Sequence, residues 1–318
     1  MQNTDCCHSC DDSCRTKVID VLGVPVRVKN YICSPDGVNY CRKDSDIKLA
    51  LAVCPVMFCP AGCPFCIAKN TGSSKRIDIE KFSRVLRALK AEDLVQRIKI
   101  TGGEPFYDVP FLNEVISLVF EVFGRDFELS VSTNGVHLDR IFEISGLERI
   151  ESIHISRHHY DDGINRRIFG GFNAPGKDEL KEIVSSVSFR DIFVYNCMLL
   201  KDFINSPGEA HKLLDFAIET GVPKVGFMEC SPVNEYAVAN AVPVESVIND
   251  DDGSLLFTRG FYDYEFCRCR DGVYLSADGS IEEFYARSTN NDICSYSRCL
   301  TFDAENHLRD GYGGNIII

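Results

Sequence analysis

The 318-residue sequence lacks the features that mark membrane and secreted proteins. No apolar run reaches the roughly 18 residues that a transmembrane helix needs. The polar start Met-Gln-Asn-Thr-Asp has neither the basic nor the apolar segment of a secretory signal. Positive charge is also scarce, since 34 Lys and Arg against 47 Asp and Glu give a net charge of −13. We therefore expect a cytoplasmic protein that binds neither nucleic acid nor an acidic membrane.

Cysteine, in contrast, is abundant, with 16 in the chain. In a reducing compartment, clustered cysteines are more often ligands of metals or iron–sulfur clusters than halves of disulfides. Three of them follow an apolar run with the spacing C-x3-C-x2-C, which lets one loop wrap one cluster: Cys59, Cys63 and Cys66. A [4Fe–4S] cluster held by three thiolates keeps one iron for a ligand that is not protein. A zinc knuckle or an incidental group of cysteines is the alternative interpretation.

From about residue 47 to residue 230 the hydrophobic pattern alternates between strand and helix. Such alternation predicts parallel strands joined by right-handed crossovers. The fold class is therefore α/β, a partial (β/α)6 barrel whose sites gather at the C-terminal ends of the strands. The predicted strands cover 47–54, 96–101, 127–133, 149–156, 191–199 and 224–229. The predicted helices cover 78–91, 111–124, 137–146, 177–187 and 207–220.

The segments before this pattern are of another kind. Residues 1–14 contain four cysteines without apolar periodicity, so they form either a metal site or a thiol-rich tail. Residues 18–45 alternate between apolar and polar side chains and contain the turn signal Ser34-Pro-Asp-Gly37, which predicts a strand pair. We therefore assign residues 1–45 to a Cys-rich tail with a strand pair, and residues 46–240 to the partial barrel.

Residues 241–318 form a third part, a Cys-containing C-terminal extension in which Asp-Gly pairs predict hairpins. Such an extension has little core of its own, so a metal or a cluster would add to its stability. We predict that its four cysteines converge in space as ligands: Cys267, Cys269, Cys294 and Cys299. Scattered, buried cysteines are the alternative.

The cysteine loop and the residues after the second strand together resemble the radical S-adenosylmethionine (SAM) superfamily. The pattern is nearest to its molybdopterin-precursor synthase and peptide-modifying branch. In that superfamily the amino and carboxylate groups of SAM occupy the open iron. Its Gly-Gly-Glu motif, which binds the SAM amino group, is matched by Gly102, Gly103 and Glu104. A plain turn before a helix is the alternative for this motif alone.

The resemblance implies further SAM contacts at the ends of later strands. These would come from Ser132, Asn134, Ser156, Arg157, Asn196 and Glu229. A guanidinium can grip a carboxylate with two hydrogen bonds, so Arg157 is the stronger candidate on the fourth strand. Asn196 stands within an apolar run and needs partners if it is buried. A helix cap with a turn is the alternative for the tip that contains Ser132 and Asn134.

A dense polar segment, His158-His-Tyr-Asp161, follows the fourth strand. A lone histidine would be read as structural, but four consecutive polar residues at a strand end favour a functional role. We therefore predict that His158, His159 and Tyr160 bind substrate or transfer protons.

For cofactors, the resemblance implies a [4Fe–4S] cluster, SAM, and a second iron–sulfur cluster in the C-terminal extension. The spacing there, C-x1-C-x24-C-x4-C, differs from the C-x2-C-x13-C of the molybdopterin branch, so structural cysteines or zinc are alternatives.

The activity implied is that of an enzyme. A reductant such as flavodoxin or ferredoxin would supply an electron to the cluster. The reduced cluster would then cleave SAM to give a 5′-deoxyadenosyl radical, which removes a hydrogen atom from a peptide or small-molecule substrate. A cyclisation of the molybdopterin-precursor type is one alternative. A non-catalytic iron–sulfur or zinc protein is another, but an electron carrier has no use for a SAM pocket.

Overall fold

The structure is a computed structural model. It describes residues 16–29, 31–32, 40–41, 47–67, 75–248, 255–261, 271–276, 281–286, 297 and 299–318. The cysteines of residues 1–14 and the predicted turn at Ser34-Pro-Asp-Gly37 lie outside the described residues.

The centre of the fold is an 11-stranded sheet with the order β11-β12-β13-β10-β9-β8-β7-β6-β5-β14-β15. Its middle consists of the six predicted strands, which pair in parallel and in chain order. They are β5 (Leu49–Val53), β6 (Val95–Ile100), β7 (Glu128–Thr133), β8 (Ser152–Ser156), β9 (Phe193–Leu199) and β10 (Lys224–Glu229). The predicted α/β fold with a mostly parallel sheet is confirmed.

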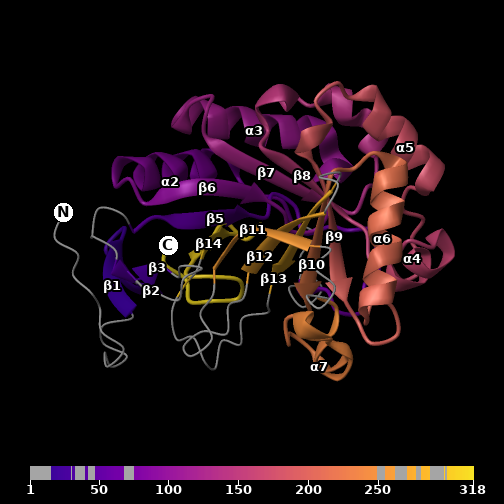
Figure 1. Ribbon diagram of the computed structural model, residues 1–318. Coiled ribbons are helices and arrows are strands. Elements are labelled where there is room, and N and C mark those ends of the chain that lie inside the picture. The colour runs from indigo at the N-terminus through magenta and orange to yellow at the C-terminus, as the bar shows by residue number, and fades with distance from the viewer. Residues whose placement is uncertain are drawn as a thin grey trace, which may run out of the picture.

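Four helices follow one another around the outer side of this sheet (Figure 1). They are α2 (Ile79–Ala91), α3 (Val109–Phe123), α5 (Lys177–Ser186) and α6 (Pro207–Thr220). Side-chain caps set three of their starts. Asp78 accepts from the backbone N–H of Lys81, Asp108 from that of Phe111, and Ser206 from that of Glu209. None of the helices in the described ranges is long and apolar enough to cross a membrane.

The predicted helix over residues 137–146 is wrong. The segment instead forms two short 3-10 helices, η4 (Leu138–Glu143) and η5 (Leu147–Arg149). His137 precedes η4 and has left-handed backbone, with a φ of 52°. Gly146 precedes η5 and is also left-handed, with a φ of 72°. A continuous α-helix cannot pass through such residues.

Several shorter helices were not predicted. They are η3 (Pro105–Asp108), α4 (Asp162–Ile168), η6 (Arg190–Ile192), α7 (Glu235–Asn240) and η7 (Val244–Ser246). Most have too few residues for a hydrophobic period to be read from the sequence.

The N-terminal strand pair is confirmed by β1 (Thr16–Val21) and β2 (Val24–Lys29), which are antiparallel. They turn at Leu22 and Gly23, both of which have positive φ. A second short antiparallel pair, β3 (Tyr31–Ile32) and β4 (Tyr40–Cys41), flanks residues 33–39.

The predicted C-terminal extension contributes strands to both edges of the same sheet. At one edge, β13 (Glu282–Ala286) is parallel to β10 and is followed outward by β12 (Asp271–Ser276) and β11 (Leu255–Phe261). At the other edge, β14 (Cys299–Phe302) is parallel to β5 and carries β15 (Leu308–Arg309). A division of the chain between residues 240 and 241 stays a prediction, since both sides share one sheet.

The two faces of the sheet differ in polarity, because successive side chains of a strand point to opposite sides. The outer face packs its apolar residues against the helices, as Leu51, Ile98, Ile153 and Val225 do in the buried core. The inner face carries half-buried polar residues between them. This alternation places polar chemistry inside the curve of the sheet and apolar packing outside it.

Candidate active site

A cavity of about 370 Å³ lies at the C-terminal ends of the central strands. Ten of the predicted site residues line it: Cys59, Cys63, Cys66, Gly102, Gly103, Glu104, Ser132, Asn134, Ser156 and His158. They come from the loops and strand ends of β5, β6, β7 and β8, which the parallel sheet brings to one edge.

The cysteine loop is held by backbone contacts on its far side. The N–H of Gly62 donates to the carbonyl oxygen of Phe169 at 2.6 Å. A Cβ atom on Gly170 would stand 2.7 Å from the Cα of Gly62, so the two backbones meet where side chains would not fit. The loop after α4 therefore fixes the position of the cysteines.

None of the three cysteines of this loop is in a disulfide, and all three line the cavity. Asn134 Nδ2 donates to the sulfur of Cys59 at 3.4 Å. Burial raises the pKa of Cys59, and the nearby carboxyl of Glu104 raises it further. Among the described residues, no three His, Cys, Asp or Glu side chains are arranged to hold a single metal ion. Thiolates that each bind a different iron of a cluster need not converge on one point.

The glycines of the Gly-Gly-Glu motif are required by the cysteine loop that packs on them. A Cβ atom on Gly103 would lie 2.2 Å from the carbonyl oxygen of Phe58. One on Gly102, where φ is 112°, would lie 2.8 Å from the Cβ of Cys54. The N–H groups of Gly103 and Glu104 donate to the carbonyl oxygens of residues 56 and 58. The motif thus joins the end of β6 to the cysteine loop.

Glu104 is a buried carboxyl, 1% exposed, and no cationic side chain of the described residues pairs with it. It accepts hydrogen bonds from Thr133 Oγ1 (2.7 Å) and from the N–H groups of Phe106 (2.9 Å) and Asn134 (2.6 Å). Burial outweighs these three donors and raises its pKa to about 7. A ligand ammonium in the cavity would supply the missing positive charge.

The tip after β7 combines a structural and a cavity-facing role. The side chain of Asn134 accepts from the N–H of Val136 at 2.9 Å, as a turn residue does, while its amide nitrogen faces Cys59. The hydroxyl of Ser132 is buried and has no hydrogen-bond partner among the described residues. A buried hydroxyl of this kind is available to a ligand.

Arg157 does not line the cavity. Its side chain is 1% exposed and lies on the outer side of the sheet, with its guanidinium 4.3 Å above the ring of Phe216. It donates to the carbonyl oxygens of Tyr160 and Pro175, both at 3.1 Å, and to the carboxylate of Asp162. These contacts join the end of β8 to α4 and α6.

His158 is the one member of the polar segment after β8 that lines the cavity. It packs against the rings of Phe65 and Phe169, and its Nδ1 accepts from the N–H of Met198 at 3.1 Å. Burial lowers its pKa to about 3. The ring is therefore neutral, and with Nδ1 as acceptor its proton is on Nε2.

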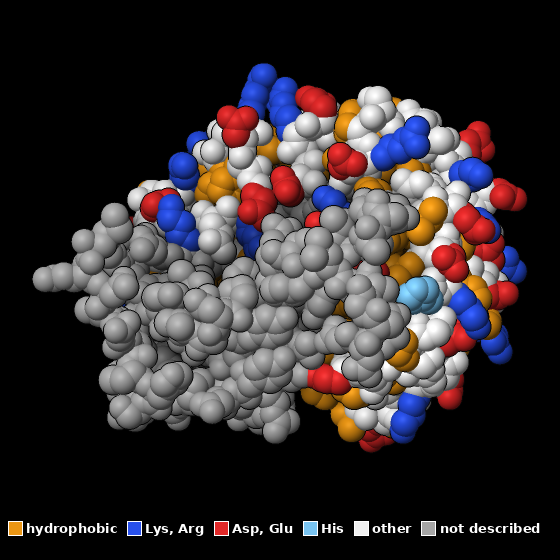
Figure 2. Space-filling model, in the orientation of Figure 1, with side chains coloured by type: hydrophobic (Ala, Val, Ile, Leu, Met, Phe, Trp, Pro, Cys, Tyr) orange, Lys and Arg blue, Asp and Glu red, His pale blue; other side chains and the backbone are white. Residues whose placement is uncertain are grey.

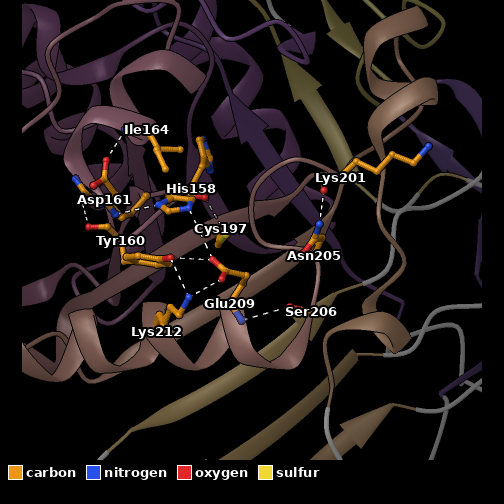
Figure 3. A network of polar contacts seen from close by, with 12 residues as sticks. His158, Tyr160, Asp161, Ile164, Cys197, Lys201, Asn205, Ser206, Glu209 and Lys212 are labelled. Atoms are coloured by element: carbon orange, nitrogen blue, oxygen red, sulfur yellow. Dashed lines mark hydrogen bonds and ion pairs between the residues drawn. The ribbon is translucent and has the colours of Figure 1, made fainter.

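His159 and Tyr160 face α6 instead, as Figure 3 shows for Tyr160. Tyr160 donates to Glu209 at 3.0 Å, and Lys212 donates to the same carboxylate at 2.7 Å. His159 Nδ1 accepts from the N–H of Asp161 at 2.9 Å. The structure places this network outside the cavity lining.

Asn196 and Glu229 also lie outside the cavity lining. On the inner face of β9, Asn196 Oδ1 contacts Nδ1 of His154 at 3.3 Å. Glu229 accepts from the N–H of Val244 at 2.9 Å and so ties β10 to η7. The cavity lining also includes residues that the sequence did not single out as site residues, among them Met198, Cys230 and Tyr312. Met198 lies two residues after Asn196 on β9, so both side chains point to the same face of the sheet. The alternation of side chains along β9 could therefore have predicted that Met198 faces the inner side.

Of the four C-terminal cysteines, Cys267, Cys269 and Cys294 lie outside the described residues. Cys299 belongs to β14 and pairs in register with Ala50 of β5, so it lies in the sheet itself. The predicted convergence of the four stays a prediction.

Comparison with known proteins places the central part of the chain. Residues 53–202 match the family described as the Radical SAM superfamily. An S-adenosylmethionine-dependent nucleotide dehydratase of Fibrobacter sp. is 32% identical over 118 residues, 35% of this chain and 34% of that protein. A probable GTP 3′,8-cyclase of Sulfurisphaera tokodaii is 24% identical over 202 residues, 60% of this chain and 58% of that protein. The chain thus spans between a third and three fifths of these relatives.

Two solved structures are similar over part of the chain. SuiB of Streptococcus suis bound to S-adenosylmethionine is 21% identical, with a TM-score of 0.47 over 60% of this chain and 43% of that chain. A radical SAM methyltransferase from Sphaerobacter thermophilus is 17% identical, with a TM-score of 0.45 over 69% of this chain and 68% of that chain.

Proposed function

Because residues 53–202 belong to the radical SAM superfamily, we propose that this protein is a radical SAM enzyme that acts on a small molecule or a peptide. The observation that carries the proposal is the meeting of the three loop cysteines with the Gly-Gly-Glu motif at one cavity. The two motifs are far apart in the chain, and a chance group of cysteines would not need to lie against the motif.

Cys59, Cys63 and Cys66 are the residues that would hold a [4Fe–4S] cluster. With SAM, that cluster supplies a 5′-deoxyadenosyl radical, which removes a hydrogen atom from the substrate. The donor set suits the group, because three cysteines of one short loop line the cavity and thiolates are the usual ligands of such clusters. Ligation by iron would deprotonate Cys59 despite its raised pKa, since a bound metal stabilises the thiolate.

Glu104 is the residue that would bind the amino group of SAM. Its carboxyl is buried, and no described cationic side chain pairs with it. The ammonium of a ligand would compensate its negative charge at a place where water does not compete for the carboxylate. Ser132 offers a hydroxyl without a protein partner to the polar end of the same ligand. Asn134 and Ser156 line the cavity on the same side. Arg157, with its three protein partners, is left out of this assignment.

For the substrate, a nucleotide-like small molecule has support in the names of the two curated relatives, one of which acts on nucleotides and the other on GTP. A cyclisation of the molybdopterin-precursor type is the second candidate, on the name of the second relative. The reductant, a flavodoxin or ferredoxin, and a second cluster at the C-terminal cysteines belong to the same proposal and rest on the resemblance alone.

The test is anaerobic reconstitution followed by assays for iron and for SAM cleavage under dithionite. The wild-type protein is expected to bind a [4Fe–4S] cluster and to release 5′-deoxyadenosine. A variant with Cys59, Cys63 and Cys66 changed to Ala is expected to lose the cluster site and the cleavage. The matched control is Cys197→Ala, because this thiol is buried on the outer face of β9, away from the cavity.

The proposal fails if the triple variant still cleaves SAM, or if the reconstituted wild-type protein does not.

A further inference from the structure

The carboxylate of SAM needs a partner in the cavity that the sequence did not identify. In SAM the carboxylate and the ammonium are attached to the same carbon atom, so the carboxylate would lie next to the ammonium that Glu104 would bind. Arg157, the residue expected to grip it, points to the outer side of the sheet and is held by three protein partners. No lysine or arginine is among the described residues that line the cavity. The side-chain donors that this lining offers near Glu104 include three hydroxyls.

Two of these hydroxyls lie side by side at the ends of neighbouring strands. β6 and β7 pair in parallel up to Ile100 and Val131, so the next residues, Thr101 and Ser132, are adjacent across the two strands. Adjacent strands are about 4.8 Å apart and their paired side chains point to the same face, so the two side chains belong to the same wall of the cavity that both residues line. The hydroxyl of Ser132 is buried without a hydrogen-bond partner among the described residues. Thr101 lies three residues before Glu104, in the turn that follows β6.

The third hydroxyl comes from Tyr312, which is far from the other two residues in the chain. Its phenol interacts with the side chain of Thr101 and lies near the thiols of Cys54 and Cys299. Tyr312 lines the cavity and is 42% exposed, so its ring stands at the mouth of the cavity rather than in the core. The three hydroxyls therefore meet on one wall of the cavity, where a single small group can contact them.

A tight turn fixes the position of Tyr312. The side chain of Asp310 accepts hydrogen bonds from the N–H of Asn315 (2.6 Å) and from its side-chain amide (3.0 Å). Gly311 and Gly313, on either side of Tyr312, have positive φ values of 148° and 67°, which glycine adopts without strain. A phenol that is held in place before the ligand binds loses little conformational freedom when it donates a hydrogen bond.

We propose that Tyr312, together with Thr101 and Ser132, binds the carboxylate of SAM. Hydrogen bonds to a charged acceptor are about twice as strong as those between neutral groups, so neutral hydroxyls are adequate donors for a carboxylate. A cationic side chain at the same place would pair with Glu104 and compete with the ligand ammonium, whereas a hydroxyl does not.

The inference rests on the proposed function and deepens it, because it gives Tyr312 the role that the sequence suggested for Arg157. Tyr312 lies outside residues 53–202, which match the superfamily. The C-terminal segment of this chain would therefore complete the cofactor site of the central strands.

The experiment compares the affinity of the cluster-reconstituted full-length protein for SAM and for decarboxylated SAM. The second ligand keeps the ammonium and the adenosine but lacks the carboxylate, and competition against SAM measures its affinity even where it binds weakly. Wild type is expected to bind SAM more tightly. Tyr312→Phe keeps the ring and removes only the hydroxyl, so its affinity for SAM is expected to fall roughly tenfold while that for decarboxylated SAM stays the same.

Two further variants complete the comparison. Thr101→Val keeps the shape of the side chain and is expected to show the same selective loss as Tyr312→Phe. Tyr107→Phe is the matched control, because Tyr107 is 49% exposed and does not line the cavity. It is expected to bind both ligands as wild type does.

Three results would overturn the role of Tyr312. These are an unchanged affinity for SAM in a Tyr312→Phe protein of normal iron content, equal losses for the two ligands, or equal binding of the two ligands by wild type. Equal losses would assign the hydroxyl to the adenosine or to the fold. If Tyr312→Phe does not fold, Thr101→Val and Ser132→Ala replace it, and unchanged SAM binding in both would overturn the site. A wild-type protein that does not bind SAM would instead refute the proposed function itself.

Discussion

Two polar segments of this protein begin where a parallel strand ends, and they face opposite sides of the sheet. The segment after β6, Thr101–Glu104, turns over the cysteine loop and into the cavity. The segment after β8, Arg157–Asp161, sends most of its side chains outward to α4 and α6 (Figure 3). A polar strand end is therefore a place where a site can form, and the path of the following loop decides whether it does.

The glycines explain the difference between the two segments. Gly102 and Gly103 bring the backbone of the first segment against the cysteine loop, so Glu104 is drawn inward. The second segment has no glycine, and it enters α4 through the cap of Asp161 on the N–H of Ile164. Arg157 is the first outward residue after the inward Ser156, as the alternation of β8 requires.

The strongest test of this comparison is Arg157→Ala. Because the buried guanidinium joins β8 to α4 and α6, its removal is expected to lower the free energy of unfolding by about 3 kcal/mol. Urea denaturation measures this loss. The affinity of the folded variant for SAM is expected to stay at the wild-type value, and a weaker affinity would place Arg157 in the cofactor site.

In contrast to Arg157→Ala, Glu104→Ala is expected to weaken the binding of SAM. It removes a charge-assisted hydrogen bond to the ligand ammonium, worth about 1.5–3 kcal/mol, so SAM affinity should fall by roughly tenfold or more. Equilibrium binding of SAM to the reconstituted protein measures the change. Glu209→Gln is the matched control, because Glu209 belongs to the outward network and should leave SAM binding unaltered. Similar losses in both variants would contradict the comparison.

SAM affinity should also depend on pH through Glu104. Its pKa is raised to about 7 in the free protein. The ligand ammonium favours the ionised carboxyl, so affinity should fall as the pH drops below 7 and the carboxyl takes up a proton. Between pH 7.5 and pH 6 a loss of roughly eightfold is expected, because the ionised fraction of a carboxyl with that pKa falls by this factor. Glu104→Gln should abolish the dependence, and a dependence that survives would assign it to another group.

The smallest effect is expected from Tyr160→Phe, which removes the hydroxyl that donates to Glu209. Because this bond is only partly buried, the free energy of unfolding should fall by about 1 kcal/mol. SAM cleavage per folded enzyme should be unchanged. A drop in the cleavage rate would return Tyr160 to the reaction site.

The surface of the molecule fits the shortage of positive charge in the sequence. Figure 2 shows acidic and basic side chains interspersed over the helices that carry the outer face, without a continuous basic area in this view.

Much of the fold could be predicted from local patterns, and part of the site could as well. The six parallel strands and four of the helices follow from hydrophobic periods, which act within one element. The segment over residues 137–146 could not be predicted, because left-handed backbone at His137 breaks a pattern that looks helical. The strands β13 and β14 could not be predicted as parts of the central sheet, because edge pairing joins residues that are distant in the chain.

The sequence by itself determined the cysteine spacing, the Gly-Gly-Glu motif and the alternation of side chains along β6, since each depends only on neighbouring residues. The tertiary structure alone decided which strand-end residues share a cavity. It turned Arg157 and Tyr160 toward α6, and it brought Tyr312 to the cavity beside Thr101. The physical reason is that burial, pairing and register are properties of contacts between distant segments. No single segment contains the information for such contacts.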